Sequence, residues 1–124
     1  MTKNKSGSFT PDVDIFDAPE RFVIYVSLPG AKKEDVVVNW GSKNGELSIA
    51  GVIRRPRGEE PQKTLMLDER KVGTFDWKVR LGSRDSPVQV EVDDITAGLE
   101  DGILTINVPK LESDDIEVKK IDIA

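Results

Sequence analysis

Carboxylates are the side chains of this sequence most able to do chemistry, because it contains neither histidine nor cysteine. Without those residues, no Ser-His or Cys-His nucleophile pair and no imidazole or thiolate zinc ligand can form. The acidic pairs Asp93-Asp94, Glu100-Asp101 and Asp114-Asp115 do not follow the spacing of a calcium-binding loop. No motif indicates a carboxylate hydrolase or a phosphate-binding loop. We therefore expect no enzymatic activity, no catalytic residue, no metal and no cofactor.

Length and charge narrow the class of protein further. The chain has 124 residues, which suits one domain, and a net charge of -5, which has the wrong sign for binding nucleic acid. No apolar run approaches the roughly 20 residues that span a membrane. Residues 1–11 lack the apolar core of a secretory signal, and the absence of cysteine removes any disulfide framework. These features predict a cytoplasmic protein.

The elements that must position any site are predicted to be strands. Segments rich in β-branched and aromatic residues alternate with turns rich in Gly, Pro, Asn and Asp, as in Arg21–Leu28 and Glu46–Ile53. Thr64–Leu67 and Val88–Val92 also have strand-like patterns, and no window has a sustained helical period. The pattern predicts an all-β, immunoglobulin-like β-sandwich of about seven to nine short antiparallel strands. It divides the chain into a short flexible arm (1–12), the sandwich (13–110) and a C-terminal extension (111–124).

Five sequence elements, in order, resemble the small heat-shock proteins, whose β-sandwich is the α-crystallin domain. The most specific is Ala97 to Leu104, which is similar to the A-x-x-x-x-G-[VI]-L turn of that family. The other four are FVIYVSLPG (22–30), KEDVVV (33–38), ELSIAG (46–51) and ERKVGTF (69–75). The chain departs from the family at Trp77, where many members carry an arginine, and in its short, polar N-terminal arm.

The resemblance implies an ATP-independent holdase chaperone that binds partly unfolded client proteins and prevents their aggregation under stress. It implies a homodimer as the unit, with C-terminal tails linking dimers into larger oligomers. The alternative is a co-chaperone-like sandwich of the CS type that docks on one folded partner. Those relatives lack the A-x-x-x-x-G-I-L turn and the I-x-I tail, so the sequence favours the holdase.

The resemblance also implies that an I-x-[IV] tripeptide in the extension docks into a groove on a neighbouring sandwich. Ile121 and Ile123 fit this motif, and Ile116 and Val118 form a second match. Residues i and i+2 of an extended segment face the same side, so both apolar side chains can enter one groove. We favour Ile121 and Ile123, because basic residues commonly precede the motif.

The predicted groove lies between the second strand and the penultimate strand. Its expected residues, for clients and tails alike, are Val36, Val38, Ile95, Ala97 and Leu99. The run of three valines at 36–38 leaves the inward face open and suggests a strand buried on both faces.

The dimer is expected to form by strand exchange, in which one subunit adds a strand to the sheet of its partner and covers an exposed edge. The residues predicted to form this interface are Thr64, Leu65, Met66, Leu67 and Trp77.

Overall fold

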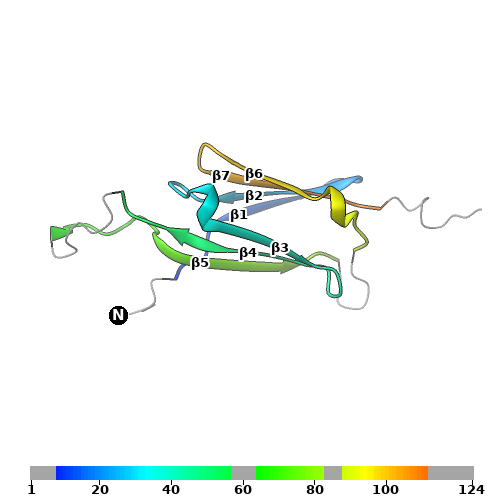
Figure 1. Cartoon of the computed structure of the whole chain (residues 1–124), viewed down its shortest axis with the longest axis horizontal. Helices are drawn as coiled ribbons and strands as arrows, with labels where there is room; N and C mark the ends of the chain where they lie inside the picture. Colours follow the sequence, from blue (N-terminus) through cyan, green and yellow to red (C-terminus); the bar gives the residue numbers. More distant parts are fainter. Residues whose placement is uncertain (1–7, 57–63, 83–87, 112–124) are drawn as a thin grey trace, which may run out of the picture.

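A computed structural model of the chain describes residues 8–56, 64–82 and 88–111. Within these residues, seven strands form two antiparallel sheets, with strand orders β1-β2-β7-β6 and β3-β4-β5. The strands are β1 (Val13–Asp17), β2 (Arg21–Ser27), β3 (Val36–Gly41), β4 (Glu46–Ile53), β5 (Gly73–Arg80), β6 (Thr96–Glu100) and β7 (Ile103–Pro109). The two sheets stack as layers (Figure 1). The predicted all-β sandwich is confirmed.

The core forms where alternate residues of the two sheets meet. Phe22, Ile24 and Val26 of β2 are buried and face Leu47 and Ile49 from the other layer's central strand. Because successive side chains of a strand point to opposite faces, this period of two in the sequence fixes which face of each sheet is apolar. The sandwich thus buries its central strands and leaves four strands at sheet edges.

A two-residue turn connects β6 to β7. Glu100 pairs with Ile103, and between them Asp101 and Gly102 both have positive φ values, 55° and 81°. Two consecutive residues with positive φ are characteristic of the type I′ turn, whose twist matches that of a hairpin. The glycine in the A-x-x-x-x-G-I-L element therefore sets the register of the hairpin.

Two predicted strands are not observed as strands. Thr64–Leu67 forms none within this chain and is exposed, while Val88–Val92 contributes only a single bridge between Val90 and Lys110. An alternating pattern is enough to make a strand only where a neighbouring strand offers its hydrogen-bonding edge. Each segment also lies next to residues outside the described ranges.

Part of the predicted flexible arm lies against the sandwich. The backbone N–H of Phe9 donates a hydrogen bond to the carbonyl of Thr74 (2.9 Å), and Phe9 forms a parallel bridge with Phe75. The two rings lie 5.6 Å apart between centroids. Residues 8 and 9 therefore cover part of the open edge of β5.

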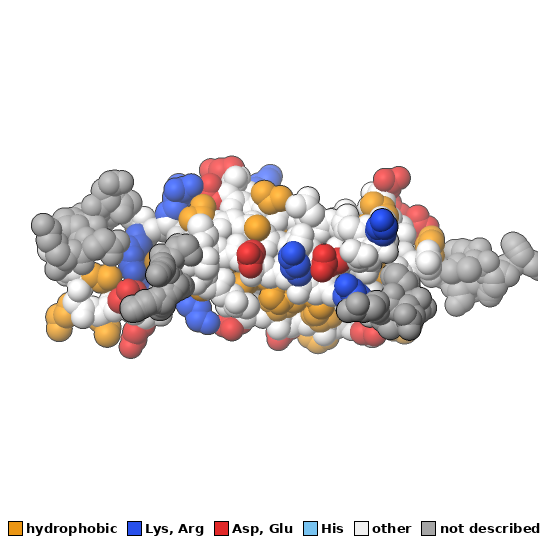
Figure 2. Space-filling view, turned by 90° about the horizontal axis from the view of Figure 1, so that it is seen from below, with side chains coloured by type: hydrophobic (Ala, Val, Ile, Leu, Met, Phe, Trp, Pro, Cys, Tyr) orange, Lys and Arg blue, Asp and Glu red, His pale blue; other side chains and the backbone are white. Residues whose placement is uncertain are grey.

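The outer face of the three-stranded sheet carries charges of both signs. Acidic and basic side chains are interspersed along the middle of this face, and hydrophobic side chains gather along one long side (Figure 2). Asp76 and Lys78 of β5 are exposed, as alternation away from buried Phe75 requires. This face has the mixed polarity of an ordinary solvated surface.

Candidate functional site

A groove opens between β3 and β6, the edge strands that lie on the same side of the sandwich. A hollow of about 350 Å³ is lined there by Lys33, Val36, Val38, Ala97, Gly98, Leu99 and Leu104. Its volume is at the low end for ligand pockets. We call it the β3–β6 groove.

The pairing of β3 with β4 shows which valines face the groove. Val38 pairs with buried Ile49, so Val36 and Val38 point inward, whereas Val37 pairs with Ala50 and is 53% exposed. The expectation that the valine run is buried on both faces is therefore wrong for Val37 within this chain. The reason is that in a two-layer sandwich only the inner face of each sheet packs against another layer, and Ala50 of the central strand β4 is exposed on the same outer face.

The pairing of β6 with β7 shows which β6 side chains form the other wall of the groove. Ala97 pairs with Ile106 and Leu99 with Leu104, both of which are buried, so the two β6 side chains face inward. Ile95 lies just before β6, is packed against the core and does not line the hollow. Four of the five predicted residues thus meet in the hollow and Ile95 does not.

Three lining residues were not predicted from the sequence: Lys33, Gly98 and Leu104. Leu104 belongs to the A-x-x-x-x-G-I-L element, so its alternation with Ile103 was a signal for an inward position. Lys33 belongs to the short 3-10 turn η1 (Lys33–Asp35), which lies at the start of β3. No linear pattern indicated that this turn would close one end of the groove.

The β3–β6 groove combines an apolar floor with two strand edges. Each edge strand carries backbone N–H and C=O groups on its open side, because only one neighbour pairs with it. An extended peptide could place alternate side chains in the hollow and hydrogen-bond along an edge. The groove therefore suits peptide binding and holds no group arranged for catalysis among the described residues.

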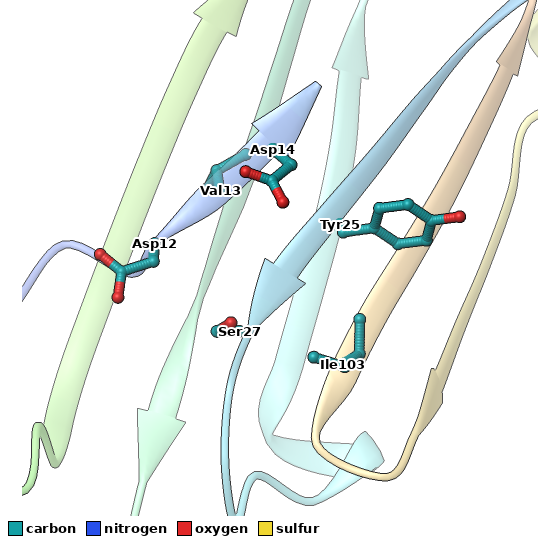
Figure 3. Close-up of a pocket in the computed structure, with 6 residues that line it drawn as sticks. All are labelled: Asp12, Val13, Asp14, Tyr25, Ser27 and Ile103. Atoms are coloured by element: carbon teal, nitrogen blue, oxygen red, sulfur yellow. The ribbon is translucent and has the colours of Figure 1, made fainter. Parts of the chain in front are cut away.

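A second open edge lies at β1, on the other side of the four-stranded sheet. Ile15 and Phe16 are 39% and 54% exposed, and Phe16 packs edge-on against Tyr25 with ring centroids 5.7 Å apart. Beside this edge, a shallow hollow on β1, β2 and β7 is lined by Asp12, Val13, Asp14, Tyr25, Ser27 and Ile103 (Figure 3). This edge has no strand neighbour within the described residues.

The residues predicted for strand exchange fall into two places. Leu65, Met66 and Leu67 are 36%, 97% and 68% exposed, and Thr64 beside them is also exposed. Trp77 lies on the inner face of β5, where it pairs with Ile49 and packs against the core. An apolar run with such exposure is unusual for a single folded chain. The predicted tail residues, Ile121 and Ile123 as well as Ile116 and Val118, lie outside the described residues.

Two layers, a groove between their edge strands and a hairpin turned at Asp101-Gly102 define an α-crystallin-type sandwich. Residues 14–124 match the profile of the Hsp20/alpha crystallin family. The chain therefore belongs to the small heat-shock protein family, and the resemblance seen in its sequence is confirmed.

Individual relatives agree with this assignment. The chain is 43% identical over 111 residues to an "SHSP domain-containing protein" of Claviceps purpurea, with 83% of this chain and 38% of that protein covered. It is 32% identical over 107 residues to heat shock protein 16 of Schizosaccharomyces pombe, with 86% and 70% covered. The chain thus spans about two-fifths of the first relative's length.

Solved structures give the same fold. Heat shock protein 16.0 from Schizosaccharomyces pombe matches with a TM-score of 0.70 at 31% identity, covering 94% of this chain and 97% of that one. A small heat-shock protein from Xylella fastidiosa matches with a TM-score of 0.72, again at 31% identity and with 94% and 97% covered. Among the described residues, no helix is both long and apolar enough to cross a membrane.

Proposed function

We propose that this protein is an ATP-independent holdase that binds extended, apolar segments of partly unfolded proteins and prevents their aggregation. The observation that carries the proposal is the β3–β6 groove, an apolar hollow flanked by two strand edges without a second neighbour in the described chain. The relatives named heat shock proteins support a role under stress.

The energetics of such a groove favour weak, reversible binding. Two buried isoleucine-sized side chains contribute roughly 3–6 kcal/mol gross. Ordering the bound segment offsets much of this gain, so a single contact has an affinity near the millimolar range. Many weak contacts in an oligomer give useful avidity while each one still releases its segment.

We also propose that two chains form a homodimer by strand exchange. Support comes from the exposed run Leu65–Leu67 and from the open edge of β1, whose exposed Phe16 offers an apolar contact. Pairing this run with the partner's β1 would cover both the apolar side chains and the unpaired backbone groups. Dimers would then be linked by the C-terminal tails docking in the β3–β6 groove of neighbours.

Aggregation of unrelated client proteins, followed by light scattering without ATP, tests the holdase function. The matched variants are Ala97→Glu, which places a carboxylate in the groove, and Thr96→Glu, which adds the same charge on the opposite face of β6. We expect wild type and Thr96→Glu to suppress aggregation and Ala97→Glu to lose most of this effect. Circular dichroism of all three proteins checks the fold.

Failure of the wild type with every client would contradict the holdase function. Equal suppression by Ala97→Glu and Thr96→Glu would show that clients bind elsewhere. If the wild type suppresses the aggregation of no client but binds one folded protein tightly, the co-chaperone-like alternative is supported instead. The expected cytoplasmic location and the expected lack of enzymatic activity stay predictions.

A further inference from the structure

A hollow lined mostly by cations lies at the end of the sandwich where β3 begins and β4 ends. It measures about 570 Å³ and is lined by Gly30, Lys32, Asp35, Arg54, Arg55, Pro56 and Arg70. We call it the basic hollow. The turn η1 contributes to this hollow and to the β3–β6 groove, but the two share no lining residue. Four cations meet here in a chain whose net charge is -5, so the hollow differs in charge from the molecule as a whole.

Strand register brings these cations together from three separate segments. The first residue of β3 pairs with Gly51, near the end of β4, so η1 and the preceding Lys32 lie beside that end (Figure 1). Arg54 and Arg55 directly follow the last residue of β4, which pairs with the first residue of β5. Arg70 stands just before β5 and is therefore brought to the same place. The pairing of the strands thus positions all four cations.

Two of the cations are held by carboxylates. Arg54 Nε lies 3.3 Å from Oδ2 of Asp35, and Arg55 Nη2 lies 3.0 Å from Oδ1 of Asp68. The Arg54 side chain is still 63% exposed, so its ion pair orients the guanidinium without withdrawing it from the hollow. Side chains that are already oriented lose less conformational entropy when they bind a ligand.

The other two cations are not balanced. Lys32 and Arg70 form no ion pair within the described part of the chain. A Cβ atom built on Gly30 would lie 3.5 Å from Nη2 of Arg70, so this guanidinium lies close to the backbone of another lining residue. Glu34 and Glu69, their exposed neighbours in the chain, do not line the hollow. Four cations and two pairing carboxylates leave the basic hollow with an excess of two positive charges.

The chemistry of this lining points to phosphate. Arginine presents planar N–H forks that match the oxygens of a phosphate group, and three of the four cations are arginines. The volume of the hollow lies within the range of small-molecule sites, roughly 300–1,000 Å³. Two phosphate groups can contact cations from more than one of the three segments at once. We propose that the basic hollow binds a small anion that carries two neighbouring phosphate groups.

A small anion fits this hollow better than a long polyanion. Charges separated by more than about 8–10 Å are largely screened at physiological salt, so a small anion experiences mainly the local excess of positive charge. A nucleic acid would extend beyond the hollow over a chain that has more acidic than basic residues. The one carboxylate of the lining, Asp35, is paired with Arg54, so we expect the anion to be bound and not hydrolysed. The inference depends neither on client binding nor on tail docking.

Isothermal titration calorimetry of the full chain with inorganic diphosphate tests the proposal without any variant. Orthophosphate and sulfate, which carry a single anionic group, are the comparison ligands. We expect diphosphate to bind about tenfold more tightly than either of them, with an affinity that falls as the salt concentration rises. No measurable binding of diphosphate, or equal binding of diphosphate and sulfate, would overturn the proposal.

Two charge-matched variants locate the binding. Lys32→Gln/Arg70→Gln removes the two unbalanced cations of the hollow. Lys43→Gln/Lys78→Gln removes two exposed lysines that lie outside the hollow and form no ion pair of the described chain. We expect the first variant to bind diphosphate about ten- to thirtyfold more weakly and the control to change the affinity less than about twofold. An equal loss in both would show that net charge alone attracts the anion.

Bound diphosphate should also stabilise the fold, because a ligand that binds only the native state raises its stability by mass action. Saturating diphosphate should raise the melting temperature of the wild type and of Lys43→Gln/Lys78→Gln, and leave that of Lys32→Gln/Arg70→Gln unchanged. Circular dichroism without ligand checks that all three proteins are folded. A rise of the same size in all three would place the binding elsewhere and overturn the site.

Sedimentation with lipid vesicles distinguishes two sources of such a ligand. The vesicles contain phosphatidylcholine with or without a phosphatidylinositol bisphosphate. Binding to the phosphorylated vesicles alone, lost in Lys32→Gln/Arg70→Gln, would support a lipid headgroup as the ligand. Binding of free diphosphate without sedimentation would support a soluble ligand such as a nucleoside diphosphate. Suppression of client aggregation in a phosphate-free buffer tests the holdase separately, so failure of either proposal leaves the other intact.

Discussion

Replacing Gly51 by alanine should destabilise the sandwich strongly for so small a change. A Cβ atom built on Gly51 would lie 2.3 Å from the backbone oxygen of Asp35 and 2.8 Å from Cζ of Phe75. Ordinary van der Waals contact begins at 3.4 Å, so both the Asp35 carbonyl of the turn η1 and the buried Phe75 ring must move away from the new Cβ. Overpacking of this kind costs about 1–3 kcal/mol, and the smaller gain from stiffening the unfolded chain offsets only part of it.

Urea unfolding of Gly51→Ala and of Gly98→Ala at one protein concentration measures this effect against a matched control. Gly98 also lies within a strand, but a Cβ there meets nothing within 4 Å. We expect Gly98→Ala to be neutral or up to about 0.5 kcal/mol more stable. Gly51→Ala should lose at least about 1 kcal/mol, with a melting temperature lower by about 4 °C or more. Equal stability of the two variants would refute the claim that the turn η1 packs directly on β4.

Three further predictions concern the core, the arm and one ion pair. Ile106→Ala removes a fully buried side chain and should lower the free energy of unfolding by about 2–5 kcal/mol in urea titrations. Phe9→Ala removes the ring contact with Phe75 and should cost about 1 kcal/mol. Amide exchange at the backbone N–H of position 9, which bonds the Thr74 carbonyl, should be faster than in the wild type. Asp17→Ala removes the 2.6 Å contact with Lys110 Nζ and leaves the lysine over the Phe22 ring. Because the Asp17 side chain is 67% exposed, thermal melting should show a loss below about 1 kcal/mol.

Most of the fold could be predicted from the sequence because its strands carry both an alternating pattern and a stop signal. The predicted segment Arg21–Leu28 corresponds to β2, and Glu46–Ile53 has the same bounds as β4. Val88–Val92 alternates equally well but forms only one bridge. Periodicity reports which side chains can share a face, and it does not report whether a neighbouring strand is available.

The apolar lining of the β3–β6 groove could be predicted from the sequence, whereas the basic residues next to the groove could not. Val36, Val38, Ala97 and Leu99 came from the family resemblance, and the period of two of their strands is compatible with it. The valine run left the inward face of β3 open, and the stacking of the two sheets brings the four residues to one hollow. The basic hollow is lined by the cations Lys32, Arg54, Arg55 and Arg70, which come from three separate segments that only tertiary structure brings together. The same limit applies to Phe9, because its contact partner Phe75 lies far from it in the sequence.

The sheet edges of this molecule differ in what covers them. Phe9 covers part of the β5 edge, and an uncovered edge of that kind invites pairing with other chains. Within residues 8–56, 64–82 and 88–111, the β3 and β6 edges have no second strand neighbour and flank one apolar hollow. Gly51 lets the backbone of Asp35 approach β4 closely, which sets the turn η1, and with it Lys33, at the end of this floor. A glycine on the core side of β4 thus shapes a groove on the surface, so its substitution should weaken tail binding as well as stability.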